Sequence, residues 1–258
     1  MAVQLGARGF DVVITARTTA EGQAREHSST VTRSDTRPLP GSLRETMAAV
    51  EATGARCMAL PADLLDRASL GALAARIEER WGAVGVLVNN GRYVGPGQLD
   101  HIVDTPIEIL DRHLEANVMG ALVLIQALVP GMLANGGGRV INITSPAGFE
   151  NPPAAAGQGG WGLGYAMSKA AFGRIAGVLD VELGDRGIVA VNVHPGFVPT
   201  QRMKLEAEHF GFDLSTGDNP DMAAVAVAWL ASDPGAVALR GATVHAADLC
   251  RDHNLLQV

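Results

Sequence analysis

The chain has 258 residues, of which 47% are hydrophobic and 18% are charged, proportions that suit one large α/β domain with a well-covered sheet. Its net charge of −7 argues against nucleic acid or an anionic membrane surface as the main partner, because few cations are available to neutralise phosphates. The two cysteines, Cys57 and Cys250, have no metal-ligand spacing, so we expect a reducing compartment, no disulfide framework and no metal site.

Short apolar segments alternate with helical patterns along the chain. The expected strands cover residues 11–15, 56–60, 84–89, 139–144, 188–193 and 243–247. The expected helices cover residues 43–53, 67–81, 106–133, 165–184 and 221–231, and Asp66 is placed to cap the second of them. Because strands this apolar cannot face water, the alternation predicts a single domain, residues 1–258, with a mainly parallel sheet covered on both faces.

The chain shows no pattern of a membrane or secreted protein. Its most apolar stretch, Val118–Val129, contains Gln126 and stops at Pro130, which is short of the roughly 20 residues that a spanning helix needs. Arg8 and Asp11 interrupt any apolar run at the N-terminus, so a signal peptide is not expected. We therefore expect a soluble, cytoplasmic protein.

Two stretches interrupt the alternation of strands and helices. Residues 18–42 are polar and long for a connection between a strand and a helix, so we expect a flexible surface insertion. Residues 146–164 are rich in Pro, Gly and Ala and contain Trp161. We interpret this second stretch as a wall of a substrate pocket, with a plain surface insertion as the alternative.

The residues with the clearest chemical meaning are in GYAMSKAAF, where Tyr165 and Lys169 lie four positions apart on one face of a helix. The pairing is informative because the chain contains only two tyrosines and two lysines. Ser145 follows an apolar strand, and the turns after residues 86–91 and 191–200 follow two more. Since ligands bind at the carboxyl ends of parallel strands, these segments predict one shared site.

Taken together and in order, eight segments resemble the short-chain dehydrogenase/reductase family, from Met1 to about Leu249. They are AR at 16–17, DL at 63–64, NNG at 89–91, N at 117, TS at 144–145, YAMSK at 165–169, HPGFVPT at 194–200 and RGATVHAAD at 240–248. The resemblance implies a Rossmann-type, doubly wound parallel sheet in three α/β/α layers with the strand order 3-2-1-4-5-6-7. It also implies a homodimer or homotetramer built through helices 106–133 and 165–184.

The same resemblance implies an NAD(P)(H)-dependent oxidoreductase that interconverts a small secondary alcohol and a ketone. Tyr165 would exchange the proton with the substrate oxygen, because an adjacent ammonium and an oxidised nicotinamide favour the phenolate. Lys169 would supply that ammonium and hold the nicotinamide ribose. Ser145 would orient the substrate oxygen, and Asn117 would hold a water leading to Lys169.

Arg17 bears on the choice of cofactor. An acidic residue after the second strand accepts hydrogen bonds from the adenine ribose and favours NAD, whereas an arginine matches a 2′-phosphate. We therefore favour NADP(H), with NAD(H) left open. The further cofactor contacts that the resemblance implies are Asp63 and Leu64 at the adenine, Asn89, Asn90 and Gly91 at its ribose, and Pro195, Gly196, Val198 and Thr200 at the nicotinamide end.

The sequence also departs from the family pattern. The family's first strand and its T-G-x-x-x-G-I-G loop should precede Met1, and that strand is the central one of the sheet. Each backbone group left unpaired at the two facing edges costs roughly 1–3 kcal/mol. We interpret the chain as an incomplete version of a normal enzyme rather than a shortened protein whose sheet closes up. These residues are then expected to bind dinucleotide poorly and to fold marginally.

Two smaller departures concern the site itself. Arg92 stands where the family's N-N-A-G motif has a glycine, and Ser145 and Tyr165 are 20 residues apart rather than about a dozen. These departures leave a second hypothesis open. The chain would then be a non-catalytic scaffold or binding paralogue that kept the fold and lost the cradle for the cofactor.

Overall fold

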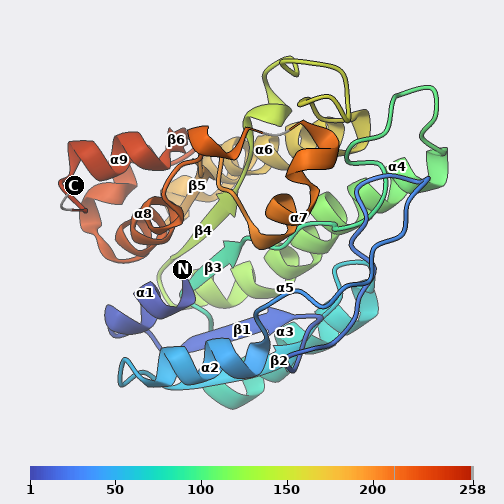
Figure 1. The fold of residues 1–258 in the computed structure, drawn as a ribbon. Coiled ribbons are helices and arrows are strands. Elements are labelled where there is room, and N and C mark those ends of the chain that lie inside the picture. Colours follow the sequence, from blue (N-terminus) through green and yellow to red (C-terminus); the bar gives the residue numbers. More distant parts are fainter. Residues whose placement is uncertain (212, 257–258) are drawn as a thin grey trace.

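The computed structural model describes residues 1–211 and 213–256, without the side chain of residue 208. The strands are β1 (Val12–Ala16), β2 (Cys57–Pro61), β3 (Val86–Asn89), β4 (Gly138–Ile143), β5 (Ile188–His194) and β6 (Thr243–His245). All strand pairs are parallel. Helices cover both faces of the strands (Figure 1). The expected α/β class with a parallel sheet is therefore confirmed.

The strands form two separate sheets. One has the order β1-β2, and the other has the order β3-β4-β5-β6. In the numbering of the family order, β2 and β1 correspond to strands 3 and 2, and β3 to β6 correspond to strands 4 to 7. The division lies where the family has its first strand. The edges of β1 and β3 that border the division therefore have no strand partner among the described residues. Figure 1 shows β1 and β2 in the lower part of the view and β3 to β6 above them.

The predicted helical segments all form helices, with bounds that differ by at most two residues. The helices are α1 (Ala2–Ala7), α2 (Leu43–Glu51), α3 (Arg67–Trp81), α4 (Ile107–Leu114), α5 (Gly120–Ala134), α6 (Leu163–Leu183), α7 (Gln201–Phe210), α8 (Pro220–Ser232) and α9 (Ala246–Asp252). Of these, α1, α7 and α9 were not predicted. Asp66 caps α3 as predicted, because its carboxylate accepts a hydrogen bond from the backbone N–H of Ser69 at 3.0 Å. The strand expected over 243–247 was too long, since the chain turns into α9 at Ala246.

Three apolar clusters hold the layers together. The largest joins β1, β4 and β5 to α1, α2, α8 and α9, and α8 contributes an unbroken buried run from Ala223 to Ala231. On the opposite face, α5 and α6 pack on β4 and β5, and α3 packs on β2. Val12 and Ile14 of β1 share the first cluster with Ile141 and Val191 of the other sheet. Side-chain packing thus spans the division that backbone pairing does not cross.

The predicted helix 106–133 is one continuous helical segment, Ile107–Ala134, of 28 residues. It contains a π-helical turn, Glu115–Met119, between α4 and α5. By length and composition it could cross a membrane, with a mean hydropathy of 1.8 over its most apolar window, so its apolar part extends beyond the stretch Val118–Val129 considered in the sequence. Half of that window is buried in the fold, and the segment packs against α3 and α6. Those contacts are typical of a core helix.

Residues 18–42 contain no helix or strand, yet polar side chains within them are buried. His27, Ser29 and Asp35 are each at least nine-tenths buried. The segment contacts the loop after β3, because Leu99 N donates to Ser29 O at 3.0 Å and Val31 N donates to the carboxylate of Asp100 at 3.0 Å. In Figure 1 it is the blue trace running beside the green loop near α4. Its flexibility stays a prediction.

Candidate active site

The ends of β3, β4 and β5 lie at one edge of the larger sheet, since the three strands are parallel and in register. The segments that follow them carry three groups of predicted site residues. These groups are Asn89, Asn90 and Gly91 after β3, Ser145 after β4, and Pro195, Gly196, Val198 and Thr200 after β5. The sequence-based expectation of a common strand edge is consistent with this arrangement.

A ladder of asparagines crosses that edge. Asn89 Nδ2 donates to Asn142 Oδ1 at 3.0 Å, and Asn142 Nδ2 donates to Asn192 Oδ1 at 3.3 Å. Asn192 Nδ2 continues to the backbone carbonyl of Gly173 on α6 at 2.7 Å. The three side chains are buried, so their mutual hydrogen bonds offset the cost of removing amides from water. The side chain of Asn89 is thus used within the sheet, while Asn90 and Gly91 beyond it are exposed.

Tyr165 and Lys169 lie one helical turn apart on α6. The Lys169 side chain is buried, with 5% of the residue exposed, and its Nζ donates to the backbone carbonyl of Ile143 at 2.7 Å. Burial, and secondarily the nearby Arg92 cation, lower the pKa of Lys169 to about 7. Tyr165 is half-buried, and its hydroxyl has no hydrogen-bond partner among the described side chains and backbone.

The Ser145 loop is held against the same turn of α6. Ser145 begins a short 3₁₀ turn, Pro146–Gly148, and its Oγ accepts from Ala147 N at 3.3 Å. A Cβ added at Gly148 would lie 2.8 Å from the carbonyl carbon of Lys169. The glycine therefore allows a close approach between the loop and α6, which brings Ser145 to the part of α6 that carries Lys169.

Asn117 lies in the π-helical turn, where its side chain is buried. Its Oδ1 accepts from the backbone N–H of Tyr93 at 2.5 Å, and its Nδ2 donates to Ser168 Oγ at 2.8 Å. Ser168 Oγ donates in turn to the backbone carbonyl of Tyr165 at 3.0 Å. Asparagine is a poor residue for a helix interior, and the extra residue of a π turn is a known way to aim such a side chain. Asn117 thus joins three elements around Tyr165.

Arg92 was noticed in the sequence only as a departure from a motif. Its guanidinium lies over the ring of Tyr165, with Cζ 5.5 Å from the ring centroid. Nη1 donates to the carbonyl of Tyr93 at 2.8 Å and to Gln98 Oε1 at 3.1 Å. A cation in this position is attracted to the electron-rich ring face. No signal in the sequence indicated the stacking, because it depends on the path of the loop after β3.

A second arginine, Arg202 of α7, was missed altogether. It is buried, and Nη1 donates to the same Gln98 Oε1 at 2.8 Å while Nε donates to the carbonyl of His27 at 2.7 Å. Its Nη2 lies 3.6 Å from the carboxylate of Glu206. Burial, followed by the Arg92 cation, lowers the pKa of Arg202 to about 10. Residues 18–42 and α7 are thereby joined beside Arg92.

The turn after β5 is shaped by Gly196, whose φ of +80° favours glycine. Its amide donates to His194 Nδ1 at 2.9 Å, and a Cβ there would come 2.1 Å from Asp218 Oδ2. Asp218 in turn accepts from Phe197 N at 2.7 Å. Thr200, predicted to contact the nicotinamide, caps α7 by accepting from Met203 N at 3.3 Å.

The predicted adenosine contacts come from both sheets. Arg17 follows β1, and its side chain makes no hydrogen bond or ion pair with the described residues. Asp63 follows β2 and accepts from Leu65 N at 3.0 Å. Leu64 lies against Gly91, since a Cβ added there would be 3.1 Å from Leu64 Cδ1. The ends of β2 and β3 therefore meet although their sheets are not joined.

The donor set fits the two ends of a nicotinamide dinucleotide. Lys169 uses one of its three N–H donors on Ile143, which leaves two for ribose hydroxyls. Arg17 and Asn90 offer unpaired polar groups near the adenosine end. In residues 1–211 and 213–256, no glycine-rich strand-to-helix turn lies between β1 and β3 to meet a pyrophosphate. The fit thus covers the nicotinamide riboside and the adenosine.

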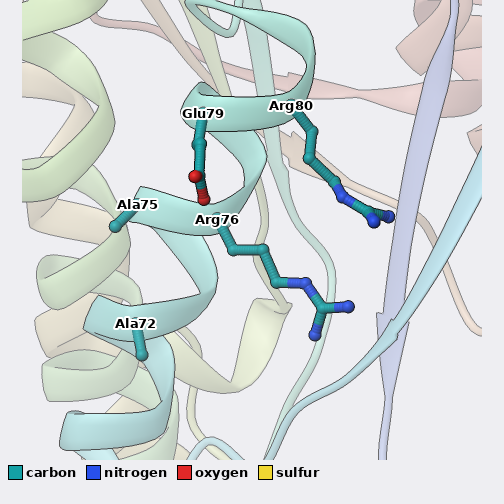
Figure 2. A pocket seen from close by; sticks show the side chains of 5 residues that line it. All are labelled: Ala72, Ala75, Arg76, Glu79 and Arg80. Carbon is teal, nitrogen blue, oxygen red and sulfur yellow. The ribbon is translucent and has the colours of Figure 1, made fainter.

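Two surface hollows lie away from the predicted site residues. One lies along α3, and Figure 2 shows the five side chains that line it, Ala72, Ala75, Arg76, Glu79 and Arg80. The other lies on the outer face of α6 and is lined by Arg174, Gly177, Val178, Val181 and Glu182. None of the predicted site residues belongs to either hollow.

Comparisons with known proteins agree with the geometry. A family model described as short chain dehydrogenase matches residues 24–209. A Mycobacterium tuberculosis protein named as an uncharacterized NAD-dependent oxidoreductase is 32% identical over 93% of this chain and 86% of its own. The 2-(R)-hydroxypropyl-CoM dehydrogenase of Xanthobacter autotrophicus is 31% identical over 54% of this chain and 53% of its own. The crystal structure of a short-chain type dehydrogenase/reductase from Mycobacterium marinum shares the fold, with a TM-score of 0.72, 21% identity and coverage of 95% of this chain and 87% of its own.

Proposed function

Because the chain belongs to the short chain dehydrogenase family, we propose that it is an oxidoreductase that interconverts a secondary alcohol and a ketone through Tyr165. The observation that carries the proposal is the buried Lys169, fixed one helical turn from Tyr165 and against the Ser145 loop. A purely structural lysine would rarely be buried without a carboxylate partner. A bound nicotinamide dinucleotide supplies or accepts the hydride.

Four side chains of the chain have distinct proposed roles in proton transfer and in positioning the substrate. The Tyr165 hydroxyl, which has no partner among the described residues, gives a proton to the carbonyl oxygen in reduction and takes it back in oxidation. When polar groups of a bound ligand or of solvent keep Lys169 protonated, its ammonium favours the phenolate form of Tyr165. Ser145 donates to the substrate oxygen and fixes its direction. Asn117 holds the backbone of Tyr165 in place through Ser168, and its role in binding a water stays a proposal.

For the cofactor we favour NADP(H), held at its 2′-phosphate by Arg17. Arg17 stands directly after β1 with its guanidinium unpaired in the described part of the chain, and a guanidinium matches a phosphate. The relative named NAD-dependent makes NAD(H) the alternative. Calorimetric titration with NADPH and NADH decides between them. Arg17→Ala is expected to lower the affinity for NADPH about tenfold or more and to change the affinity for NADH little.

The activity itself is tested by following dinucleotide absorbance with a panel of ketones and secondary alcohols. Tyr165→Phe removes the proton donor and is expected to lower kcat about 10²- to 10⁴-fold. Tyr93→Phe is the matched control, because it removes the hydroxyl of the other tyrosine. Equal activity of Tyr165→Phe and the wild type contradicts the proposed role of Tyr165.

The second hypothesis, a non-catalytic scaffold or binding paralogue, draws on the division between β1 and β3. It predicts that the folded chain binds neither NADPH nor NADH and shows no turnover, while its circular dichroism is that of an α/β domain. Measurable dinucleotide affinity together with turnover excludes it.

We also propose a homodimer or homotetramer through helices 106–133 and 165–184. Val178 and Val181 on the outer face of α6 are 45% and 86% exposed and line a shallow hollow, and exposed apolar patches of this kind favour association. Sedimentation equilibrium that shows only monomer argues against it. A cytoplasmic location, expected from the two free cysteines, stays a proposal as well.

A further inference from the structure

We propose that the site selects substrates that carry a carboxylate, small hydroxy acids and oxo acids, with Arg92 binding the carboxylate while the reacting oxygen lies at Tyr165. This inference rests on the proposed function and names its substrate class. It starts from a residue that the family motif does not supply, since Arg92 replaces the glycine of that motif.

Arg92 is anchored by one of its nitrogens. Nη1 donates to the carbonyl of Tyr93 and to Gln98 Oε1, whereas Nε and Nη2 have no hydrogen-bond partner among the described residues. The Nε–Nη2 edge is one of the two edges with which a guanidinium grips a carboxylate through paired hydrogen bonds. Arg92 thus has its orientation fixed on one side and a recognition edge open on the other.

The position of that edge links it to the reaction. The guanidinium lies over the ring of Tyr165, with Cζ 5.5 Å from the ring centroid. A ligand held by Arg92 would therefore lie beside Tyr165. This separation suits a compact acid, in which the carboxylate is close to the carbon that changes oxidation state.

The balance of charge also favours an anion. Three basic side chains lie near Tyr165: Arg92 over its ring, Lys169 one helical turn along α6, and Arg202, which shares Gln98 with Arg92. Glu206 is the one carboxylate that pairs with any of them among the described side chains, and the negative charge of Asp35 also acts on Arg202. The charge of Arg92 also lowers the pKa of Lys169 and Arg202, although burial has the larger effect. A carboxylate on Arg92 relieves this excess of positive charge, whereas a neutral ketone does not.

The scaffold around Arg92 supports a specific role. Gln98 bridges Arg92 to the buried Arg202, which is itself tied to residues 18–42 and to Glu206. The Arg202 donors are thus used by protein groups, so we assign Arg202 a positioning role and Arg92 the contact with substrate. Fixing a long side chain in advance lowers the entropic cost of binding.

Paired probes test the inference. 3-Hydroxybutyrate and its methyl ester are both secondary alcohols, and they differ in one negative charge. For the wild type we expect kcat/KM to favour the acid by about 10- to 100-fold, the size typical of a charge-assisted pair of hydrogen bonds. Arg92→Gln should abolish the preference by lowering kcat/KM for the acid while leaving kcat/KM for the ester unchanged. Arg92→Lys should keep part of the preference. The matched control, Arg76→Gln, removes an exposed arginine of α3 and should leave the ratio unchanged.

A binding measurement without turnover separates this inference from the proposed function. Saturation-transfer NMR with 3-hydroxybutyrate should show contact with the wild type and not with Arg92→Gln, whether or not the protein oxidises it. Calorimetry with NADPH and NADH should give the same affinities for both proteins. An acid-to-ester ratio or an NMR response that is unchanged in Arg92→Gln overturns the inference. A loss confined to dinucleotide affinity overturns it too, because Arg92 would then bind a cofactor phosphate.

Discussion

The Lys169 ammonium donates a hydrogen bond to the backbone carbonyl of Ile143 at 2.7 Å, two residues before Ser145 in the chain. This bond ties the helix that carries Tyr165 to the end of β4. It also takes the ammonium out of water, since 5% of Lys169 is exposed. The hydrogen bond therefore helps to set the geometry of the candidate site, while burial, with the Arg92 cation second, lowers the pKa of the lysine.

The first prediction concerns Lys169→Met. Because burial and the Arg92 cation lower the lysine pKa to about 7, below the value of 10.5 for an exposed lysine, the unfolded chain binds one more proton than the folded chain between about pH 7 and 10.5. The lysine therefore costs little stability above this window, and its cost grows as pH falls through it and levels off below about pH 7. Urea denaturation across this range should show the variant gaining stability relative to the wild type as pH falls. A difference independent of pH contradicts the prediction.

Asn117→Ala is expected to lower both the stability of the protein and its kcat. The change leaves Tyr93 N and Ser168 Oγ without their buried partner, at a cost of about 2–4 kcal/mol for two such groups. Since Ser168 also holds the carbonyl of Tyr165, kcat should fall as well. Asn135→Ala, which removes an exposed amide bonded to Gly131 O at 2.8 Å, should cost less than about 1 kcal/mol. Equal losses of stability in Asn117→Ala and Asn135→Ala contradict the prediction.

Asn142→Leu tests the asparagine ladder. The leucine has a similar volume but leaves Asn89 Nδ2 without its acceptor and Asn192 Oδ1 without its donor. We expect thermal unfolding to show a loss of about 2–4 kcal/mol. Adding Asn89→Leu to this variant should cost less than the sum of the single changes, because the amide left unpaired is then gone. Simple additivity would show that the ladder is not coupled.

Gly196→Ala is compared with Gly82→Ala, because both glycines have a φ of +80°. At Gly82 nothing lies within 4 Å of an added Cβ, so the cost is that of the backbone alone, about 1–3 kcal/mol for a conformation with ψ of −165° that glycine almost alone adopts. At Gly196 the Cβ would also meet Asp218 at 2.1 Å and displace the 195–200 turn. Calorimetry should show weaker dinucleotide binding for Gly196→Ala alone. Unchanged affinity in both variants argues against a cofactor role for this turn.

Much of the fold was predictable from local patterns. Short apolar runs, most of them with β-branched residues, identified the six strands of the described residues, and the three- and four-residue spacing of apolar side chains identified α3 to its ends. The short helices α1 and α9 and the helix α7 were missed, because they are brief or polar and depend on contacts with the rest of the chain. The π-helical turn at Asn117 was missed for a related reason, since its backbone is determined by side-chain bonds to Tyr93 and Ser168.

The residue types and spacing by themselves determined the α/β class, the parallel strands and the helical turn that joins Tyr165 to Lys169, because these depend on periodicity along the chain. The family was indicated by the resemblance of the chain's motifs, taken in order, to those of a known family. The tertiary structure alone decided which polar groups face one another. It stacked Arg92 on Tyr165 and joined Arg92 to Arg202 through Gln98. The physical reason is that these contacts join residues distant in sequence, and their partners are chosen by packing and burial rather than by local preference.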